Sequence, residues 1–163
     1  MPPDIAQHHP DTVDRAIVGR LQRDGRIPNV DLAEAVSLSP SACLRRVKAL
    51  ENDGIIAGYR AVVDPARAGL GLTVFLELQV DTHNRETSTQ VEEALTAIPA
   101  IVACHIVSGD ADFFVEAMVP DLAAYEKLLI DKILTIPSIT NAKSTFVIRT
   151  GLSRGPLPLD HWR

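Results

Sequence analysis

The spacing of the apolar residues changes at Gly54, and this change limits the folds that a chain of 163 residues can adopt. Before Gly54, apolar residues such as Val13, Ile17 and Leu21 recur at the spacing of an amphipathic helix. After it, segments such as Thr73–Val80 carry an apolar residue at every second position, as strands with one buried face do. The sequence therefore predicts two domains of different class, one built from helices and one built around a β-sheet.

Three helices are expected in the first domain. The second helix covers Val30–Val36, and the third begins at Pro40 with Ser39 as its N-cap. The third helix should end before Gly54, because glycine often follows a helix. The last two helices are joined by a short turn and so form a helix-turn-helix pattern. A β-segment is expected over Ile55–Val63.

The second domain is expected to have the order strand, helix, strand, strand, helix, strand. This is the order of a ferredoxin-like α+β fold, in which both helices cover one face of an antiparallel sheet. The other face would expose side chains such as Phe75, so we expect a dimer that packs sheet against sheet. The expected strands are Thr73–Val80, Ile101–Val107, Phe113–Val119 and Ser144–Arg149, and the expected helices are Arg85–Ile98 and a segment capped by Asp121.

The boundaries between these parts follow from local composition. Residues 64–71 are rich in Gly, Ala and Pro and are expected to form a hinge. The hinge would separate a helix-turn-helix domain over 11–63 from a ferredoxin-like domain over 72–152, and 153–163 would form a C-terminal tail. We expect the first ten residues and the tail segment Arg154–Pro158 to be poorly ordered unless a partner holds them.

Composition excludes several classes of function. The apolar runs are far shorter than the ~20 residues that a membrane span needs, and the N-terminus lacks the pattern of a signal peptide. Neither Cys43 and Cys104 nor the five histidines show the spacing of metal ligands. No group of residues has the pattern of a catalytic site. We therefore expect a cytoplasmic protein that has no enzyme activity, cofactor, metal or membrane role.

The predicted third helix carries the residues that we expect to contact DNA. Residues 39–63 have a net charge of +2, although the whole chain has a net charge of −5. The helix would bury Cys43, Leu44 and Leu50 and would expose small and basic side chains, as a helix that reads the major groove requires. A merely solvated helix face is the alternative. The expected DNA contacts are Ser39, Ser41, Ala42, Arg45, Arg46 and Lys48.

The turn Gly109-Asp110-Ala111-Asp112 is the second candidate site. Glycine allows backbone N–H groups to converge on a carboxylate, and an aspartate can hold an ammonium group. Together they suit a zwitterionic amino acid. The alternative is an ordinary hairpin turn, since Gly and Asp are common in such turns.

Motifs in both domains point to one family. They are Leu38-Ser39-Pro40-Ser41, Cys43-Leu44-Arg45-Arg46-Val47-Lys48, Gly58-Tyr59-Arg60-Ala61 and Ser108-Gly109-Asp110-x-Asp112-Phe113. From about Val13 to Leu159 the chain resembles the Lrp/AsnC (feast/famine) family of bacterial and archaeal transcriptional regulators. The resemblance implies a winged helix-turn-helix domain, followed by a ferredoxin-like domain for ligand sensing and oligomerisation. It also implies homodimers that assemble further into octamers.

The resemblance implies a function as well. It is that of a sequence-specific regulator of genes for amino-acid metabolism or transport, which binds operator half-sites in double-stranded DNA and responds to an amino-acid effector. Ala111 stands where the family often has an aromatic residue, which would open the effector pocket. An architectural DNA-wrapping protein without an effector, and a ferredoxin-like metabolite-binding protein or enzyme, are the alternatives. The implied effector-binding residues are Ser108, Gly109, Asp110, Asp112 and Ser144.

Overall fold

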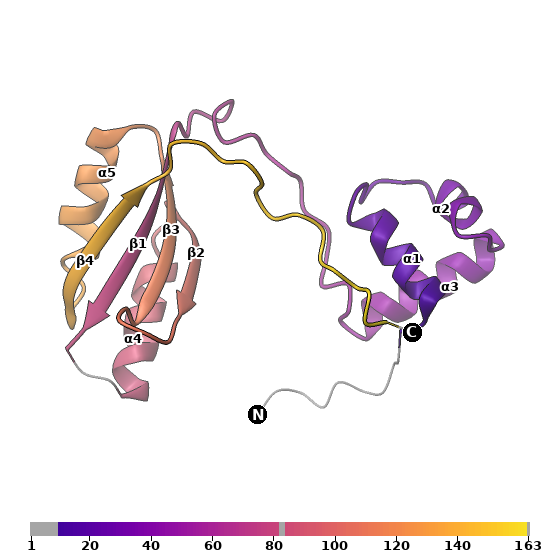
Figure 1. The fold of residues 1–163 in the computed structure, drawn as a ribbon, viewed down its shortest axis with the longest axis horizontal. Coiled ribbons are helices and arrows are strands. Elements are labelled where there is room, and N and C mark those ends of the chain that lie inside the picture. The colour runs from indigo at the N-terminus through magenta and orange to yellow at the C-terminus, as the bar shows by residue number, and fades with distance from the viewer. Residues whose placement is uncertain (1–9, 82–83, 163) are drawn as a thin grey trace. The chain divides into compact units, whose positions relative to one another are not determined.

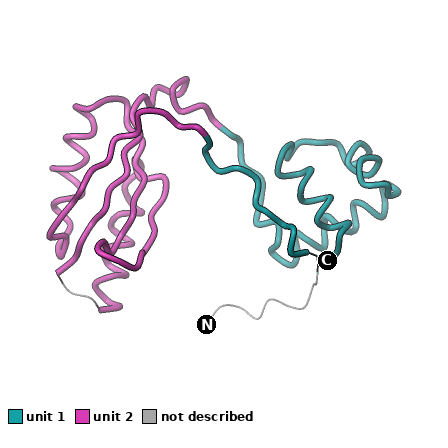
Figure 2. The backbone as a smooth tube through the Cα atoms, viewed as in Figure 1, with its two compact units in different colours: residues 1–62, 152–163 teal, residues 63–151 magenta. Residues whose placement is uncertain are grey.

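The computed structural model describes residues 10–81 and 84–162, which form two compact units (Figure 2). The first unit contains the described residues up to Val62 together with those of 152–163, and the second contains the described residues of 63–151. Each unit has its own hydrophobic core. The expectation about the first ten residues lies outside the described residues, except at Pro10.

The first unit is a bundle of three helices around a small core. The helices are α1 (Thr12–Leu21), α2 (Asn29–Ala35) and α3 (Pro40–Asn52) (Figure 1). Asp11 caps α1, because its carboxylate accepts hydrogen bonds from two backbone N–H groups of the first turn. Ile17, Leu32 and Leu50 contribute one buried side chain from each helix. The three predicted helices are therefore present, and α2 begins one residue before its predicted start.

The segment that follows α3 is not a strand. The predicted β-segment Ile55–Val63 is wrong, because none of its residues pairs with a described strand. A strand needs a neighbour to accept and donate its backbone hydrogen bonds, and an alternating pattern cannot supply one. Instead, Ile55 and Ile56 pack against the helical core, whereas Val62 is fully exposed.

The C-terminal segment lies against α1, to which it adds polar contacts. Gln22 directly follows α1; its side chain donates to the carbonyl of Leu157 at 3.3 Å and accepts from the backbone N–H of Leu157 at 2.5 Å. Arg15 and Asp160 form a longer ion pair at 3.8 Å. We expected this tail to need a partner for order, and α1 of the same chain contacts it.

The second unit contains a four-stranded antiparallel sheet in the order β2-β3-β1-β4. This strand order confirms the predicted ferredoxin-like α+β fold. The last strand begins five residues before the predicted Ser144, because it pairs with β1 along the stretch from Val74 to Val80. The strands are β1 (Leu72–Val80), β2 (Ile101–Ile106), β3 (Phe113–Val119) and β4 (Ile139–Phe146).

Two helices cover one face of this sheet. They are α4 (Arg85–Thr96) and α5 (Leu122–Leu128), and α5 continues as a π-helical turn, η1 (Leu129–Ile133) (Figure 1). Leu76 of β1 shares a buried cluster with Leu95 of α4 and with Tyr125 of α5. None of the helices within the described ranges is both long and apolar enough to cross a membrane.

The other face of the sheet carries the alternate residues of each strand. Phe75, Glu77 and Gln79 of β1 lie there and are only half-buried, because side chains alternate between the two faces of a strand. The ring of Phe75 stacks on that of Phe114 of β3, with centroids 5.3 Å apart. An aromatic pair and polar side chains thus share the face opposite the helices.

Candidate nucleic-acid interface and effector pocket

The start of α3 is fixed by Ser39 and Pro40 in the roles that the sequence predicted, as N-cap and first helical residue. The Oγ atom of Ser39 accepts a hydrogen bond from the backbone N–H of Ala42 at 3.3 Å, and Pro40 is the first residue of the helix. Asn29, the first residue of α2, donates its side-chain N–H to the carbonyl of Pro40 at 2.9 Å. These bonds hold the turn between α2 and α3 and set the direction in which α3 leaves it.

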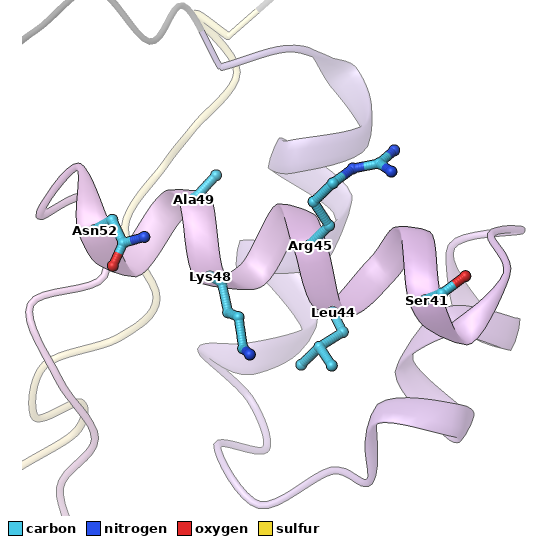
Figure 3. Close-up of a pocket in the computed structure, with 6 residues that line it drawn as sticks. All are labelled: Ser41, Leu44, Arg45, Lys48, Ala49 and Asn52. Atoms are coloured by element: carbon cyan, nitrogen blue, oxygen red, sulfur yellow. The ribbon is translucent and has the colours of Figure 1, made fainter.

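One side of α3 is buried and the opposite side is open. Cys43 and Leu50 are fully buried in the helical core, and burial raises the pKa of the Cys43 thiol. The open side contains a shallow hollow of about 500 Å³ (Figure 3). The residues that line this hollow are Ser41, Leu44, Arg45, Lys48, Ala49 and Asn52, and we call them the outer face of α3.

Leu44 belongs to the outer face and not to the core, so its predicted burial is wrong. Its side chain is 43% exposed. Leu44 lies three residues after Ser41 and four before Lys48, a spacing that places all three on the same side of a helix. A helical wheel predicts that Leu44 lies on the buried side with Cys43 and Leu50, whereas the core of this unit contains Cys43 and Leu50 but not Leu44.

The outer face carries two cations that point away from the bundle. Arg45 and Lys48 are exposed, and no described carboxylate forms an ion pair with either. Ser41 is also exposed, and its Oγ lies 3.3 Å from that of Ser39. Ala42 is half-buried beside them. Cations and hydroxyls on one open helix face are the groups that bind DNA phosphates and the edges of bases.

Arg46 occupies a different position from Arg45, although the two are adjacent in sequence. Its Nη1 atom lies 2.9 Å from Oδ2 of Asp11 and 2.8 Å from Oδ1 of Asp14, at the start of α1. The Asp14 side chain is only 1% exposed. The hydrogen bond to Asp14, followed by that to Asp11, raises the pKa of Arg46. This ion pair joins α1 to α3, so Arg46 points toward α1 and does not belong to the outer face of α3.

The far end of α3 is linked to the segment that follows it. The hydroxyl of Tyr59 donates to the Glu51 carboxylate at 2.9 Å, and the Tyr59 ring leaves little room for a side chain at Gly25, since an added Cβ there would lie 3.4 Å from the ring. Burial of Tyr59, followed by its bond to Glu51, raises the pKa of the phenol. The motif Gly58-Tyr59-Arg60-Ala61, noted in the sequence, therefore includes a contact that holds this segment against α3.

The turn between β2 and β3 contains most of the predicted effector residues. Ser108, Gly109 and Asp110 are exposed, and Gly109 has a φ of 126°, which a residue with a side chain rarely adopts. Asp112 ties the turn to β1: its Oδ2 accepts from the backbone N–H of Val80 at 2.8 Å. The turn thus presents exposed groups on a base that is fixed by hydrogen bonds.

The side chain of Ser144 lies on the face of the sheet that the helices cover, whereas Gln79 of β1, which contacts the turn, lies on the open face. It pairs with Leu76, whose side chain is in the core, and its hydroxyl shares a hydrogen bond with the hydroxyl of Tyr125 of α5. Side chains that point toward the helices cannot at the same time line the open face. The structure therefore separates Ser144 from the other predicted effector residues.

A polar depression of about 220 Å³ lies beside the turn, on the face of the sheet away from the helices. Gln79 donates to the carbonyl of Asp110 at 2.7 Å and accepts from the side chain of Asn141 at 3.1 Å. Lys143 forms an ion pair with Glu77 at 3.0 Å. The residues that line the polar depression are Glu77, Gln79, Asp110, Ala111, Asn141 and Lys143.

Of the predicted effector residues, only Asp110 lines the polar depression. Sequence reasoning missed Gln79, Asn141 and Lys143 because they come from β1 and β4, which are far apart in the chain. Their positions on one face of neighbouring strands are a signal only once the register is known. No cluster of three or more possible metal-ligating side chains occurs in the part of the chain that the structure describes.

Each unit matches the model of a known protein family. Residues 10–57 match a family described as winged helix-turn-helix DNA-binding, and residues 73–157 match the Lrp/AsnC ligand binding domain. The leucine-responsive regulatory protein of Klebsiella pneumoniae is 40% identical over 138 residues, which are 85% of this chain and 84% of that protein.

Solved structures give the same result. A transcriptional regulator from Neisseria meningitidis, solved as a complex with L-Met, is similar with a TM-score of 0.88 and 32% identity over 93% of this chain and 97% of that chain. An AsnC family transcriptional regulator from Agrobacterium tumefaciens has a TM-score of 0.88 and 33% identity over 93% of this chain and 98% of that chain. Both units are covered by these matches, and the chain therefore belongs to the Lrp/AsnC family of DNA-binding transcriptional regulators.

Proposed function

We propose that this regulator reads specific DNA sequences by placing the outer face of α3 in the major groove. The observation that carries the proposal is the orientation of the basic residues of α3: Arg45 and Lys48 point outward, whereas Arg46 is paired inward. Arg45 can donate two parallel hydrogen bonds to a guanine, and Lys48 can bind a phosphate or a base. Ser39, Ser41 and Ala42 form the small N-terminal end that lets α3 approach the bases, and Arg46 positions α3.

A dimer would present two such helices to paired half-sites in double-stranded DNA. The open face of the sheet, with Phe75 stacked on Phe114, supports a homodimer formed sheet to sheet. Assembly of such dimers into octamers, as the family resemblance implies, would allow one particle to bind several half-sites. The regulator then acts in the cytoplasm by binding alone, and its function needs neither a catalytic step nor a cofactor.

The effector that we propose is an amino acid. Two related regulators, one from Neisseria meningitidis and one from M. tuberculosis, were each solved as a complex with L-methionine. In this chain, the exposed turn of Ser108, Gly109 and Asp110 adjoins the polar depression, so the charged ends of an amino acid have both donors and carboxylates within one small area. Asp112 would hold this turn in place. Ser144 faces the helices, so it could influence an effector in the polar depression only indirectly, through the sheet.

A salt-titrated DNA-binding assay tests both parts of the proposal. The probe is the DNA upstream of the protein's own gene, with and without a mixture of the twenty amino acids. Tight binding that weakens as salt increases, and that one subset of amino acids changes, is the expected result. Binding that no amino acid changes would leave an architectural DNA-wrapping protein. Absence of binding at low salt would remove the DNA-reading proposal and favour a protein that only binds metabolites.

A further inference from the structure

Leu44 is an apolar side chain at a position where the proposed function needs polar ones. It lines the outer face of α3 between Ser41 and Lys48, and in Figure 3 it projects to the same side as Lys48. Its neighbours on this face otherwise carry a hydroxyl, an amide, two cations and one methyl group. A large apolar group in such a setting raises the question of what covers it when the protein functions.

The fold itself gives Leu44 no packing role. The core cluster of the first unit contains Cys43 and Leu50 of α3, and Val47 packs against it, but Leu44 is not part of that cluster. Leu44 is 43% exposed, so part of its apolar side chain is in contact with water, which is unfavourable compared with burial of that area. A partner that covers Leu44 would therefore come from outside the core of this unit.

The neighbours of Leu44 favour DNA as that partner. A protein surface covering Leu44 would also have to desolvate Arg45 and Lys48, which is unfavourable unless carboxylates pair with both. A DNA duplex supplies phosphates to both cations and at the same time offers an apolar group in the major groove. That group is the 5-methyl of thymine, because no other base edge of the major groove presents a methyl.

We propose that Leu44 reads the methyl group of a thymine in each half-site and so is a specificity-determining residue. The inference rests on the proposed function, since it requires α3 to lie in the major groove. In this arrangement Arg45 and Lys48 bind groups that are polar or charged, and Leu44 binds the apolar group beside them. A thymine at that position of the operator is preferred to the other bases.

The experiment begins with a selection of duplexes from a random-sequence pool by the full-length wild-type protein. In the selected duplex, each thymine is then replaced in turn by uracil, which lacks only the 5-methyl group. At one thymine position of each half-site, we expect this replacement to weaken wild-type binding about fourfold, the effect of removing one buried methyl group. The Leu44→Ala variant should bind the thymine and uracil duplexes equally at that position.

Three control variants separate this effect from others. Leu44→Met keeps an apolar side chain of similar size and should retain the preference for thymine. Arg45→Ala should weaken binding to all selected duplexes but keep the difference between thymine and uracil. Val30→Ala removes another exposed apolar side chain, on α2, and should change neither quantity. Because Leu44 is not in the core, thermal unfolding of Leu44→Ala should match that of the wild type.

Several outcomes would overturn the inference. It fails if no uracil replacement weakens wild-type binding, if Leu44→Ala keeps the full sensitivity, or if the selected half-sites contain no thymine. It also fails if Leu44→Ala leaves DNA binding unchanged but lowers the oligomeric state, which would assign Leu44 to a protein contact. In these cases the proposed function survives. If the wild-type protein selects no sequence at all, the proposed function fails together with the inference.

Discussion

The outer face of α3 and the polar depression beside the β2–β3 turn differ in how their polar groups are engaged. On α3, Arg45 and Lys48 point outward, and no described carboxylate pairs with them. In the polar depression, Gln79 bonds both Asp110 and Asn141, and Lys143 pairs with Glu77. The outer face can therefore bind a polyanion without giving up internal contacts. A ligand of the polar depression must exchange internal hydrogen bonds for its own, which lowers its affinity and couples binding to rearrangement.

A second comparison, within α3, shows that adjacent residues of one type can have separate roles. Arg45 and Arg46 are 100° apart around the helix axis by helical geometry, and only Arg46 reaches the carboxylates of α1. The proposal therefore gives Arg46 a role in stability and Arg45 a role in DNA recognition.

Replacement of Arg46 should have the largest effect on stability. Arg46→Ala removes the guanidinium from the buried Asp14 carboxylate, and we expect the first unit to lose about 2–3 kcal/mol of unfolding free energy. Arg46→Lys should recover only part of this loss, because an ammonium group cannot reproduce both contacts of the guanidinium. Urea unfolding followed by circular dichroism measures the change. A stability equal to that of the wild type would show that the ion pair contributes nothing.

Replacement of Arg45 should leave stability unchanged and weaken specific DNA binding by about 1–3 kcal/mol. The reason is that its side chain is exposed and makes no ion pair with a described residue. Binding is measured on the selected duplex over a series of salt concentrations. Arg67→Ala, which removes an exposed arginine of the second unit, is the matched control and should bind as the wild type does. Equal losses in both variants would indicate a general charge effect instead of readout by Arg45.

Replacement of Asp110 should affect the effector response and not DNA binding. Loss of a carboxylate that holds the ammonium group of an amino acid should weaken effector binding about tenfold, or about 1.4 kcal/mol. The measurement is the amino-acid concentration that half-maximally changes DNA affinity, in wild type and Asp110→Ala. Asp112→Asn tests the supporting role, since it alters the acceptor of the Val80 N–H group and should lower the stability of the second unit. An unchanged response in Asp110→Ala would move the effector away from the polar depression.

The pH dependence of stability tests the charge of Asp11, which both caps α1 and pairs with Arg46. The backbone N–H of Asp14, together with Arg46, lowers the pKa of Asp11 below its ordinary value of 3.8. The folded state therefore binds its proton less readily than the unfolded state does. The stabilisation from Asp11 is fully present above pH 3.8 and is lost as the pH falls through the lower folded value.

Asp11 is partly exposed, so we expect a loss of less than about 1 kcal/mol. The measurement compares urea midpoints at pH 5 and at progressively lower pH, on the order of pH 3, in wild type and Asp11→Asn. The difference between the two proteins should narrow as the pH falls. A difference that stays constant over this range would show that the charge of Asp11 does not stabilise the fold.

Local sequence signals predicted the parts of the fold that depend on neighbouring residues. Ser39 and Pro40 mark the start of α3, and Phe113–Val119 is a strand over the residues that the alternating pattern indicated. Asp121 caps α5 as expected, through its bond to the backbone N–H of Ala124. Such features need only a few consecutive residues, because caps, turns and strand periodicity are local properties.

Contacts between distant residues explain what the sequence did not predict. The start of β4 depends on its register with β1, and Ile55–Val63 forms no strand because no described strand pairs with it. Ser144 was grouped with the turn by family resemblance, whereas the register of β4 turns its side chain toward Tyr125. A periodic pattern shows which faces can be buried but not which neighbour will cover them.

By itself the sequence determined the class of each unit, the N-cap of α3, and the membership of the Lrp/AsnC family. The tertiary structure alone decided which arginine of α3 is paired, that Leu44 is exposed, and that Gln79 and Asn141 meet beside Asp110. The physical reason is the separation along the chain of the residues that determine each feature. Helix and strand periods arise from neighbours along the chain, whereas ion pairs, burial and pockets arise from packing between segments that the sequence keeps apart.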